Sequence, residues 1–503
     1  MKKKNWQIYY PILLGTYAAV GLVSVNISQM FLSAGMRSIM LTVIFSLAVY
    51  ALFCWRIKDE HKAAMLCAWF MLFFFAYGHI FGALEEIKIF GVVVGRHRFI
   101  FPLWLAVFGT GAWWIYRRAA RLETFSRILN MVGIVLLIIP IFQIGLFEWH
   151  RYSPVTGIEN VTTTSIIQGT SSLSNNKLPD IYYIILDGYP RQDVLLKYHN
   201  FDNIDFINEL EAIGFYVPTC SQSNYAMTDL SLSSSLNMNY LEGLNQNIHA
   251  INLTESIIHN GVRQFLEQEG YKTVSFDSGI WFTELQDASY YISQNRPVIS
   301  SFFDFTYLSE FEFLFVRTTV LRLAEEAKSA WLDALFQNPQ KENYDRILFE
   351  FDQLGNSPSL PGPKFVFVHI MAPHGYPFIF DAEGNLVEAN STDPALGNDL
   401  LYINKRTLEA VRAIILQSKI PPIIIIQGDH GIDTEVRMAN LIAYYFPNGG
   451  IKFLYPTITP VNSFRLVFNT YFGQDLPLLP DVSYYSSYED MFHFTEVQYS
   501  CNP

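Results

Sequence analysis

Long runs of apolar residues set the first part of the chain apart from the rest. Five such segments lie before residue 150, at about 6–25, 39–55, 63–84, 99–116 and 128–147. Each is close to the ~20 residues that a helix needs to cross the hydrocarbon core of a bilayer. Short polar connectors join them, which is not typical of a water-soluble helical core. The pattern predicts a transmembrane bundle of five helices over residues 1–150.

Positive charges in the short loops predict how this bundle is oriented. Lysines and arginines gather at 2–4, 56–62 and 117–127, three places that share one side of a five-span arrangement. Basic loops normally stay in the cytoplasm, so everything after residue 150 is expected outside it. The basic residues of loop 85–98 are a partial exception. We expect the first segment to be a retained anchor, because four more apolar segments follow it and no clear small-residue cleavage site is present.

The remainder of the chain has a different pattern. Residues 151–177 are rich in Ser, Thr and Asn, which is typical of a flexible linker. From 178 to 503, short apolar runs alternate with amphipathic segments, and this predicts an α/β domain with a mostly parallel central sheet sandwiched by helices. The main expected strands are 181–186, 273–276, 365–370 and 422–427, with shorter ones at 215–217, 439–446 and 451–454. The expected helices are 203–213, 230–236, 255–268, 321–335, 344–354, 399–418 and 461–472.

Composition narrows the choice of partners and compartment. Half of the residues are hydrophobic, 16% are charged, and the net charge is −12. The outer domain contains no basic block, so nucleic-acid binding is not expected. Cys220 and Cys501 lie in that domain, where oxidation is permitted, and the sequence leaves open whether they pair. The aromatic-rich segment 297–315 is either core or a surface that contacts the membrane.

Polar groups follow three of the apolar runs. The run 423–426 leads through Gln427 and Gly428 into Asp429 and His430, the run 181–186 ends at Asp187, and the run 365–370 contains His369. The carboxyl ends of parallel strands meet at one edge of a sheet, where α/β domains place their sites. A lone Asp-Gly is commonly a turn and a lone buried His commonly a core residue. The three ends together predict one metal site with oxygen and nitrogen ligands.

A hydroxyl-rich segment, 221–237, supplies a candidate nucleophile. Thr228 stands just before a run with helical spacing, which would place its hydroxyl at a helix N-terminus. The helix dipole and free N–H groups there favour anions. A metal-bound threonine alkoxide can attack phosphorus. The alternative is that Thr228 or Ser231 only caps the helix.

Together these residues resemble the alkaline phosphatase and sulfatase superfamily. More narrowly, the chain looks like the lipoteichoic acid synthases and the lipid A phosphoethanolamine transferases, whose five spans precede an extracytoplasmic sulfatase-like domain. The resemblance covers the whole architecture, with motifs from about 180 to 447. It implies that Asp187, Thr228, Asp429 and His430 hold one divalent metal ion and that Thr228 is the nucleophile.

The resemblance also suggests residues that contact the substrate. His374 best matches a histidine that contacts the transferred group, and His369 is the alternative. Arg437 and Asn440, just after the Asp-His pair, are candidates for substrate binding, with a surface or packing role equally open. Mixed carboxylate and imidazole ligands favour Mn²⁺ or Zn²⁺, while Mg²⁺ and Ca²⁺ stay open.

The chain departs from these families in two ways. Asp187 stands where the transferases usually have Glu, and hydrolytic sulfatases show a pair of acidic residues there. The Cys-x-Pro-x-Arg or Ser-x-Pro-x-Arg sequence that directs formylglycine formation does not occur near Thr228, which argues against a formylglycine sulfatase.

The resemblance implies a bacterial inner-membrane enzyme with an extracytoplasmic catalytic domain. It would move a head group of phosphoglycerol or phosphoethanolamine type from a membrane lipid, an anionic phosphodiester, to a lipid or glycan acceptor through a threonine-linked intermediate. The sequence leaves two alternatives open: a phosphodiesterase or other hydrolase that uses water, and a catalytically dead relative that binds polysaccharide or supports an envelope assembly.

Overall fold

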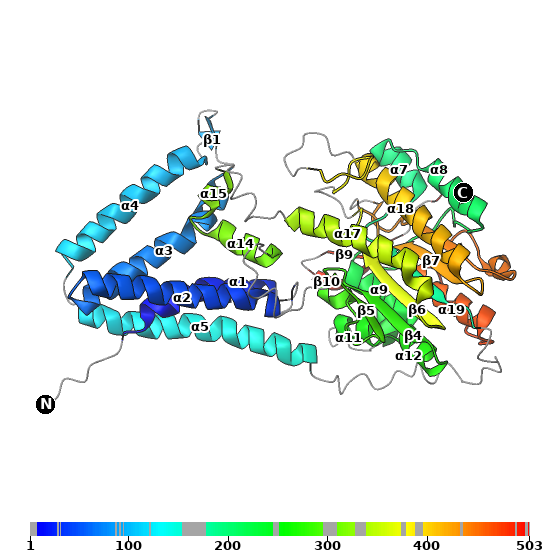
Figure 1. The fold of residues 1–503 in the computed structure, drawn as a ribbon, viewed down its shortest axis with the longest axis horizontal. Coiled ribbons are helices and arrows are strands. Elements are labelled where there is room, and N and C mark those ends of the chain that lie inside the picture. The colour runs from blue at the N-terminus through cyan, green and yellow to red at the C-terminus, as the bar shows by residue number, and fades with distance from the viewer. Residues whose placement is uncertain are drawn as a thin grey trace. The chain divides into compact units, whose positions relative to one another are not determined.

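The computed structural model describes residues 8–27, 30, 32–85, 88–89, 92–93, 95–119, 122–152, 178–244, 251–294, 309–326, 339–373, 379–387, 396–432, 436–487, 490–497 and 501. The chain forms two compact units (Figure 1). The first unit combines Met1–Ser153 with Arg296–Pro339, and the second combines Pro154–Asn295 with Gln340–Pro503. The expected division at 150 and 178 assigned residues 296–339 to the outer domain.

Apolar helices dominate the first unit, as the hydropathy pattern predicts. Helices α2 to α5 are each long and apolar enough to cross a membrane. Helix α1, at 17 residues, is about 26 Å long, slightly shorter than the ~30 Å hydrocarbon core. A two-residue pairing, β1 with β2, lies between α3 and α4. The bounds are α1 (Tyr10–Asn26), α2 (Leu32–Arg56), α3 (Glu60–Leu84), β1 (Lys88–Ile89), β2 (Val92–Val93), α4 (His97–Arg117) and α5 (Leu122–Tyr152).

Two further helices of the first unit come from the middle of the sequence expected to form the outer domain. They are α14 (Glu310–Thr318) and α15 (Arg322–Glu326). Phe311 of α14 is buried in an apolar cluster with residues of α1 and α5. The described end of the aromatic-rich segment 297–315 therefore packs into the helical bundle. Of the expected helix 321–335, residues 321–326 lie within the described part of the chain, and α15 forms from 322 to 326.

The second unit is built on a six-stranded sheet with the order β5-β4-β6-β3-β7-β8. All neighbouring pairs are parallel except β7 with β8. All six residues of β3 are buried, because helices cover both faces of the sheet. This explains why the sequence there is a continuous apolar run rather than an alternating one. The strands are β3 (Ile181–Leu186), β4 (Lys272–Phe276), β5 (Tyr290–Ile292), β6 (Lys364–Ile370), β7 (Ile423–Gly428) and β8 (Ile442–Tyr445).

Successive side chains of β3 point into two separate cores. Tyr182, Ile184 and Leu186 pack with α7 (Gln192–His199), α8 (Ile204–Ile213), α17 (Pro339–Asn356) and α18 (Leu396–Gln417). Ile181, Tyr183 and Ile185 pack with α9 (Thr228–Asn237), α11 (Leu253–Ile258), α12 (Gly261–Gln268) and α19 (Pro460–Tyr471). The sandwich predicted for the outer domain is confirmed.

The structure differs from the prediction in local details. The expected helix 255–268 is two helices, because the Asn260 side chain accepts a hydrogen bond from Arg263 N and so begins α12 afresh. Residues 451–454, expected as a strand, lie in and just after the 3-10 turn η6 (Gly450–Phe453). An antiparallel hairpin, β9 (Ser483–Ser487) with β10 (Asp490–Val497), was not predicted. The remaining short elements are α10 (Leu241–Leu244), η3 (Trp281–Thr283) and η4 (Ser357–Ser359).

Cys220 and Cys501, whose pairing the sequence left open, form a disulfide with a Cα–Cα distance of 5.6 Å. The bond joins the segment before α9 to the chain beyond β10. The two cysteines are separated by 281 positions in the sequence.

Candidate metal centre and nucleophile

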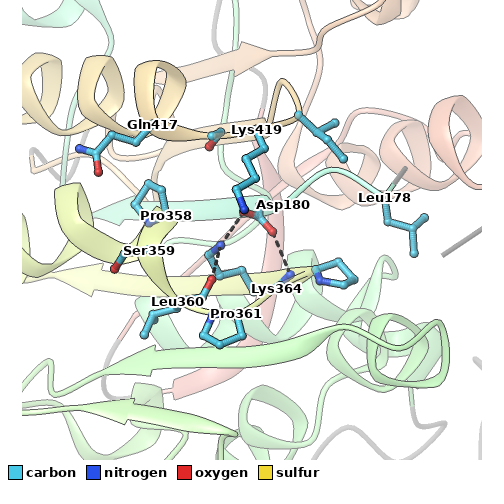
Figure 2. A pocket seen from close by; sticks show the side chains of 13 residues that line it. Leu178, Asp180, Pro358, Ser359, Leu360, Pro361, Lys364, Gln417 and Lys419 are labelled. Atoms are coloured by element: carbon cyan, nitrogen blue, oxygen red, sulfur yellow. Dashed lines mark hydrogen bonds and ion pairs between the residues drawn. The ribbon is translucent and has the colours of Figure 1, made fainter. Parts of the chain in front are cut away.

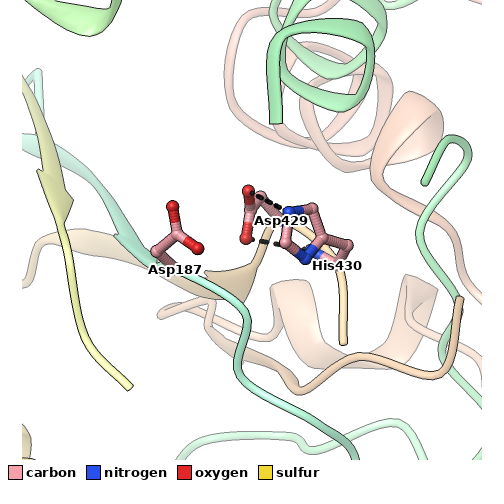
Figure 3. Close-up of side chains that lie close together, drawn as sticks. All are labelled: Asp187, Asp429 and His430. Carbon is pink, nitrogen blue, oxygen red and sulfur yellow. Dashed lines mark hydrogen bonds and ion pairs between the residues drawn. The ribbon is translucent and has the colours of Figure 1, made fainter. Parts of the chain in front are cut away.

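Strand register brings the candidate ligands together. In the parallel pairings Leu186 lies opposite Gly428, so Asp187 and Asp429 each follow a matched strand end. Both aspartates and the adjacent His430 are buried, with 1%, 0% and 3% of their surface exposed. One ligand atom from each lies within 4.8 Å of the others (Figure 3). The structure thus brings three of the four expected metal ligands into one cluster.

The Asp429 carboxylate is oriented by the backbone on one side only. Its Oδ1 accepts hydrogen bonds from Gly188 N and His430 N, both at 2.9 Å. Its Oδ2 is buried, accepts no hydrogen bond from the described residues, and lies 3.4 Å from His430 Nε2. A buried carboxylate oxygen without a hydrogen bond is costly unless a cation meets it. Oδ2 therefore fits the role of a metal ligand.

His430 has the protonation pattern of a nitrogen ligand. Its Nδ1 lies 2.9 Å from the Gly431 carbonyl oxygen. A carbonyl only accepts, so Nδ1 carries the proton and Nε2 presents a lone pair. Burial is the largest effect on the pKa of His430 and lowers it; Arg437 acts in the same direction, and Asp429 and Asp187 oppose them. A neutral imidazole with its second nitrogen held by a carbonyl is a common arrangement at metal sites.

Thr228 reaches this cluster from the start of α9. Its Oγ1 lies 3.2 Å from His430 Nε2. Met227 occupies the N-cap position in an extended conformation, without a side-chain cap. The Ser231 hydroxyl donates to the Asp429 carbonyl at 2.8 Å and ties the first turn of α9 to the end of β7. The Thr228 hydroxyl is thus directed to the site rather than to helix capping, and the helix dipole lies beside it.

Arg437 and Asn440 have different surroundings. Arg437 is partly buried, and its Nη2 donates to His430 Nε2 at 3.1 Å. Its Nε donates to the Ala226 carbonyl at 2.6 Å, which holds the guanidinium beside the N-terminus of α9. Asn440 is fully buried, and its amide donates to the Gly428 carbonyl at the end of β7. In this structure Arg437 is part of the cluster, whereas Asn440 holds the strand end.

His369 contacts the site through Asp187. Its Nε2 lies 3.1 Å from Asp187 Oδ2, and its Nδ1 lies 3.0 Å from Thr283 Oγ1. This pair orients the Asp187 carboxylate. Neither Thr283 nor the role of Ser231 had a signal in the sequence, because each depends on a contact with a distant segment. His374 lies outside the described residues.

A cavity lies at the other end of the same strands (Figure 2). It has a volume of about 500 Å³ and is lined by Asp180, Lys364 and Lys419 together with three prolines. Asp180 Oδ2 is 2.5 Å from Lys364 Nζ, and Oδ1 accepts from Lys364 N at 3.1 Å. Six residues of strand separate this end from the cluster, or roughly 20 Å. This cavity is therefore separate from the cluster at the carboxyl end of the sheet.

No protein-family model and no curated protein sequence matches the chain. Among solved structures it is similar to the C-terminal periplasmic domain of EcEptC from Escherichia coli in complex with Zn. The identity is 11%, the match covers 65% of this chain and 94% of that one, and the TM-score is 0.42.

The chain is also similar to two enzyme structures among the other matches. One is the integral membrane protein lipooligosaccharide phosphoethanolamine transferase A from Neisseria meningitidis, with 11% identity, 88% of both chains covered and a TM-score of 0.33. The other is the lipoteichoic acid synthase LtaP from Listeria monocytogenes, with 13% identity, 62% of this chain and 80% of that one covered, and a TM-score of 0.37. These are the two groups of proteins that the motifs resemble.

Proposed function

We propose that this protein is a metal-dependent membrane transferase that moves a phospholipid head group, of phosphoglycerol or phosphoethanolamine type, onto a lipid or glycan acceptor. The observation that carries the proposal is the position of the Thr228 hydroxyl. It stands at the N-terminus of α9, 3.2 Å from His430 Nε2, beside two buried carboxylates. A nucleophile, a cation site and an anion-favouring helix end meet at one point.

The donor set fits one divalent cation. Asp187, Asp429 and His430 would hold it with Thr228, and the mixture of oxygen and nitrogen donors favours Mn²⁺ or Zn²⁺. Two ionised carboxylates this close repel each other unless a positive charge lies between them. When bound, the cation supplies a lowered pKa for the Thr228 hydroxyl and polarises a phosphoryl oxygen.

The reaction proposed for these residues has two displacements. Thr228 Oγ attacks the phosphorus of a phosphodiester lipid, and the bond from phosphorus to the diacylglycerol oxygen breaks. The head group, now esterified to Thr228, is then attacked by an acceptor hydroxyl, which releases the threonine. Arg437 would contact a phosphoryl oxygen, and His374 would protonate the leaving oxygen or stabilise charge. His369 and Ser231 would hold Asp187 and α9 in place.

The setting of the site supports a lipid donor. Helices α2 to α5 indicate a multi-pass membrane protein. The disulfide between Cys220 and Cys501 is typical of an oxidising compartment, which supports placing the second unit outside the cytoplasm. We propose the bacterial inner membrane as the location, with membrane phospholipid as the head-group donor.

The test replaces the nucleophile in the full chain. With a lipid labelled in its head group, Thr228→Ala should lower turnover about a thousandfold because the covalent step is lost. Mass spectrometry of acid-quenched wild-type enzyme should find the head group on the peptide that contains Thr228. Ser234→Ala, on the same helix but bonded to the Asn239 carbonyl, is the matched control and should keep activity.

Each outcome of this test assigns a function. Label in a lipid or glycan product supports the transferase. Label released only as the free head group would assign the protein to phosphodiesterases that use water. Full turnover by Thr228→Ala would contradict the proposed nucleophile. A wild-type chain that turns over no donor and binds no metal would be a binding protein rather than an enzyme.

A further inference from the structure

Residues 309–326 interrupt the outer domain in sequence but belong to the helical unit in space. Helix α14 opens with a capping box between Ser309 and Glu312 and packs against α2 and α3. The Phe315 ring lies 5.8 Å from the Phe75 ring of α3. The segment is therefore a built part of the bundle.

An ion pair joins this segment to a membrane-spanning helix. Arg37 donates from Nε and Nη2 to the two carboxylate oxygens of Glu312. Only 7% and 6% of these side chains are exposed. Arg37 is the sixth residue of α2, in a helix otherwise apolar enough to span a bilayer. A charge in such a helix requires a partner, and here the partner comes from a segment 275 residues away.

The contact continues along the second half of α3. Val320 N donates to the Phe74 carbonyl at 2.9 Å. Gly78 allows this approach, because a Cβ there would overlap the Arg317 carbonyl. Further along, Arg322 pairs with Glu85 at 3.0 Å. Phe74 lies ten residues before the end of α3, or about 15 Å along the helix axis, so the segment reaches well into the depth of a bilayer.

The exposed side chains of the segment agree with this setting. Leu314, Arg317 and Leu321 are exposed, a mixture of apolar groups and one cation. Such a surface fits an element that enters the bilayer, because leucine side chains can face acyl chains and a long arginine side chain can extend its guanidinium toward the head groups.

We infer that residues 309–326 form a re-entrant membrane element, and that Arg37 and Glu312 are positioning residues that keep the catalytic unit available to a donor lipid. The inference rests on the proposed function for its substrate. In sequence, 14 residues (295–308) lie between the second unit and the start of the element, and 12 residues (327–338) lie between its end and α17. The other connection between the helical unit and the second unit, residues 153–177, has 25. At ~3.6 Å per residue, each shorter connection limits reach to about 50 Å. Anchoring the element therefore raises the effective concentration of the site near lipid.

The activity test uses the full chain in phospholipid vesicles and compares two donors. One donor is a labelled lipid of the vesicle, and the other is the water-soluble bis(p-nitrophenyl) phosphate. Glu312→Arg and Arg37→Glu should each lower turnover of the lipid donor about threefold, the change expected when the 25-residue connection replaces connections of 12 to 14 residues, while turnover of the soluble donor stays unchanged. The double variant, which swaps the charges, should restore the lipid reaction in part, because Glu312 is also a member of the capping box with Ser309.

Glu123→Arg is the matched control. Glu123 pairs with Arg127 on the exposed face of α5, so its reversal should change neither reaction. Unchanged lipid turnover in both single variants of the buried pair would overturn the inference. Equal loss on both donors that the double variant does not restore would overturn it too, since a structural role alone would explain that result.

A cross-link tests the seating of the element without any activity. In a chain with Cys54→Ala and Cys67→Ala, the pair Phe75→Cys and Phe315→Cys should be joined by a short thiol cross-linker in native membranes, and neither single variant should be. Absence of the cross-link would overturn the inference even if the transferase proposal holds. A wild-type chain inactive on both donors would contradict the proposed function and leave the cross-link to decide this element.

Discussion

The carboxylates at the two ends of the central strands differ in the groups that balance their negative charge. At the amino end, Asp180 meets Lys364, whose ammonium also donates to the Leu360 carbonyl at 3.2 Å. At the carboxyl end, Asp187 and Asp429 meet a neutral imidazole, and Asp429 Oδ2 accepts no hydrogen bond from the part of the chain that is described. At the amino end a lysine of the protein meets the carboxylate directly. At the carboxyl end the Arg437 guanidinium donates to His430 Nε2, and the two carboxylates and the imidazole form a donor set for a cation that comes from solution.

A third buried carboxylate shows what happens without any cation. Asp399 is 2% exposed and accepts hydrogen bonds at Oδ1 from Ile379 N and Phe380 N. Burial raises its pKa to about 6. The three cases form a series in which the counter-charge is a lysine, a proposed metal ion, or only backbone N–H groups.

The largest expected effect separates the two ends by activity. Asp429→Asn keeps an Oδ1 that accepts from Gly188 N and His430 N but loses the negative charge that a cation needs. Turnover of lipid donor should fall about a thousandfold, or about 4 kcal/mol. Asp180→Asn, its counterpart at the amino end, should leave the turnover of folded protein nearly unchanged. Equal losses in both variants would remove the functional difference between the ends.

For the free energy of unfolding, the larger effect is expected at the amino end of the strands. Lys364→Met leaves the partly buried Asp180 without its cation and should lower the unfolding free energy of the second unit by about 3 kcal/mol. Denaturant titration with a probe in that unit measures the loss. Adding Asp180→Asn should recover part of it, since the stranded charge is then removed. A single variant as stable as wild type would show that this pair contributes nothing.

The Asp399 carboxylate gives a pH-dependent effect. Its folded pKa, about 6, lies above the ordinary value, so ionising it costs stability; the cost is complete above pH 6 and absent below about pH 4. Asp399→Asn retains an oxygen for both N–H groups. It should stabilise the protein by about 2 kcal/mol at pH 8 and by nothing near pH 3.5. A pH-independent difference in melting would contradict this.

The smallest expected effect is a difference in sign between two variants, measured as the change in unfolding free energy of metal-free protein. In chelator-treated protein, Asp429→Asn removes repulsion between two close carboxylates and should raise the unfolding free energy by about 1 kcal/mol. Asp180→Asn should lower it under the same conditions. If Asp429→Asn destabilises the metal-free protein as much as Asp180→Asn does, the two ends are equally satisfied and the comparison fails.

The residues at the carboxyl end of the sheet could be predicted from the sequence because they follow regular strand and helix patterns. Apolar runs at 181–186 and 423–426 indicate buried strands, and parallel strands carry their following residues to one edge. Asp187 and Asp429 could be placed together without any knowledge of register, and Thr228 followed from helical spacing. The sandwich of helices on both faces came from the same alternation of strand and helix patterns.

The other features depend on contacts between segments that have no local signature. Nothing around Glu312 indicates a partner at Arg37, since the helix that holds Arg37 reads only as an apolar span. The break at Asn260 arises because a side-chain cap begins a new helix within a continuous amphipathic pattern. The hairpin formed by β9 and β10 has mixed Tyr, Ser and Glu positions without a clear alternation. The pairing of His369 with Asp187 needed the register of β3 and β6.

The most direct test of the account is the metal content of the full-length protein, measured by elemental mass spectrometry for wild type, Asp180→Asn and Asp429→Asn. The account predicts about one divalent transition metal per chain in wild type and in Asp180→Asn, and almost none in Asp429→Asn. Wild-type protein without metal, or an Asp429→Asn variant that keeps a full complement, would contradict the claim that the carboxyl end of the sheet is a metal centre.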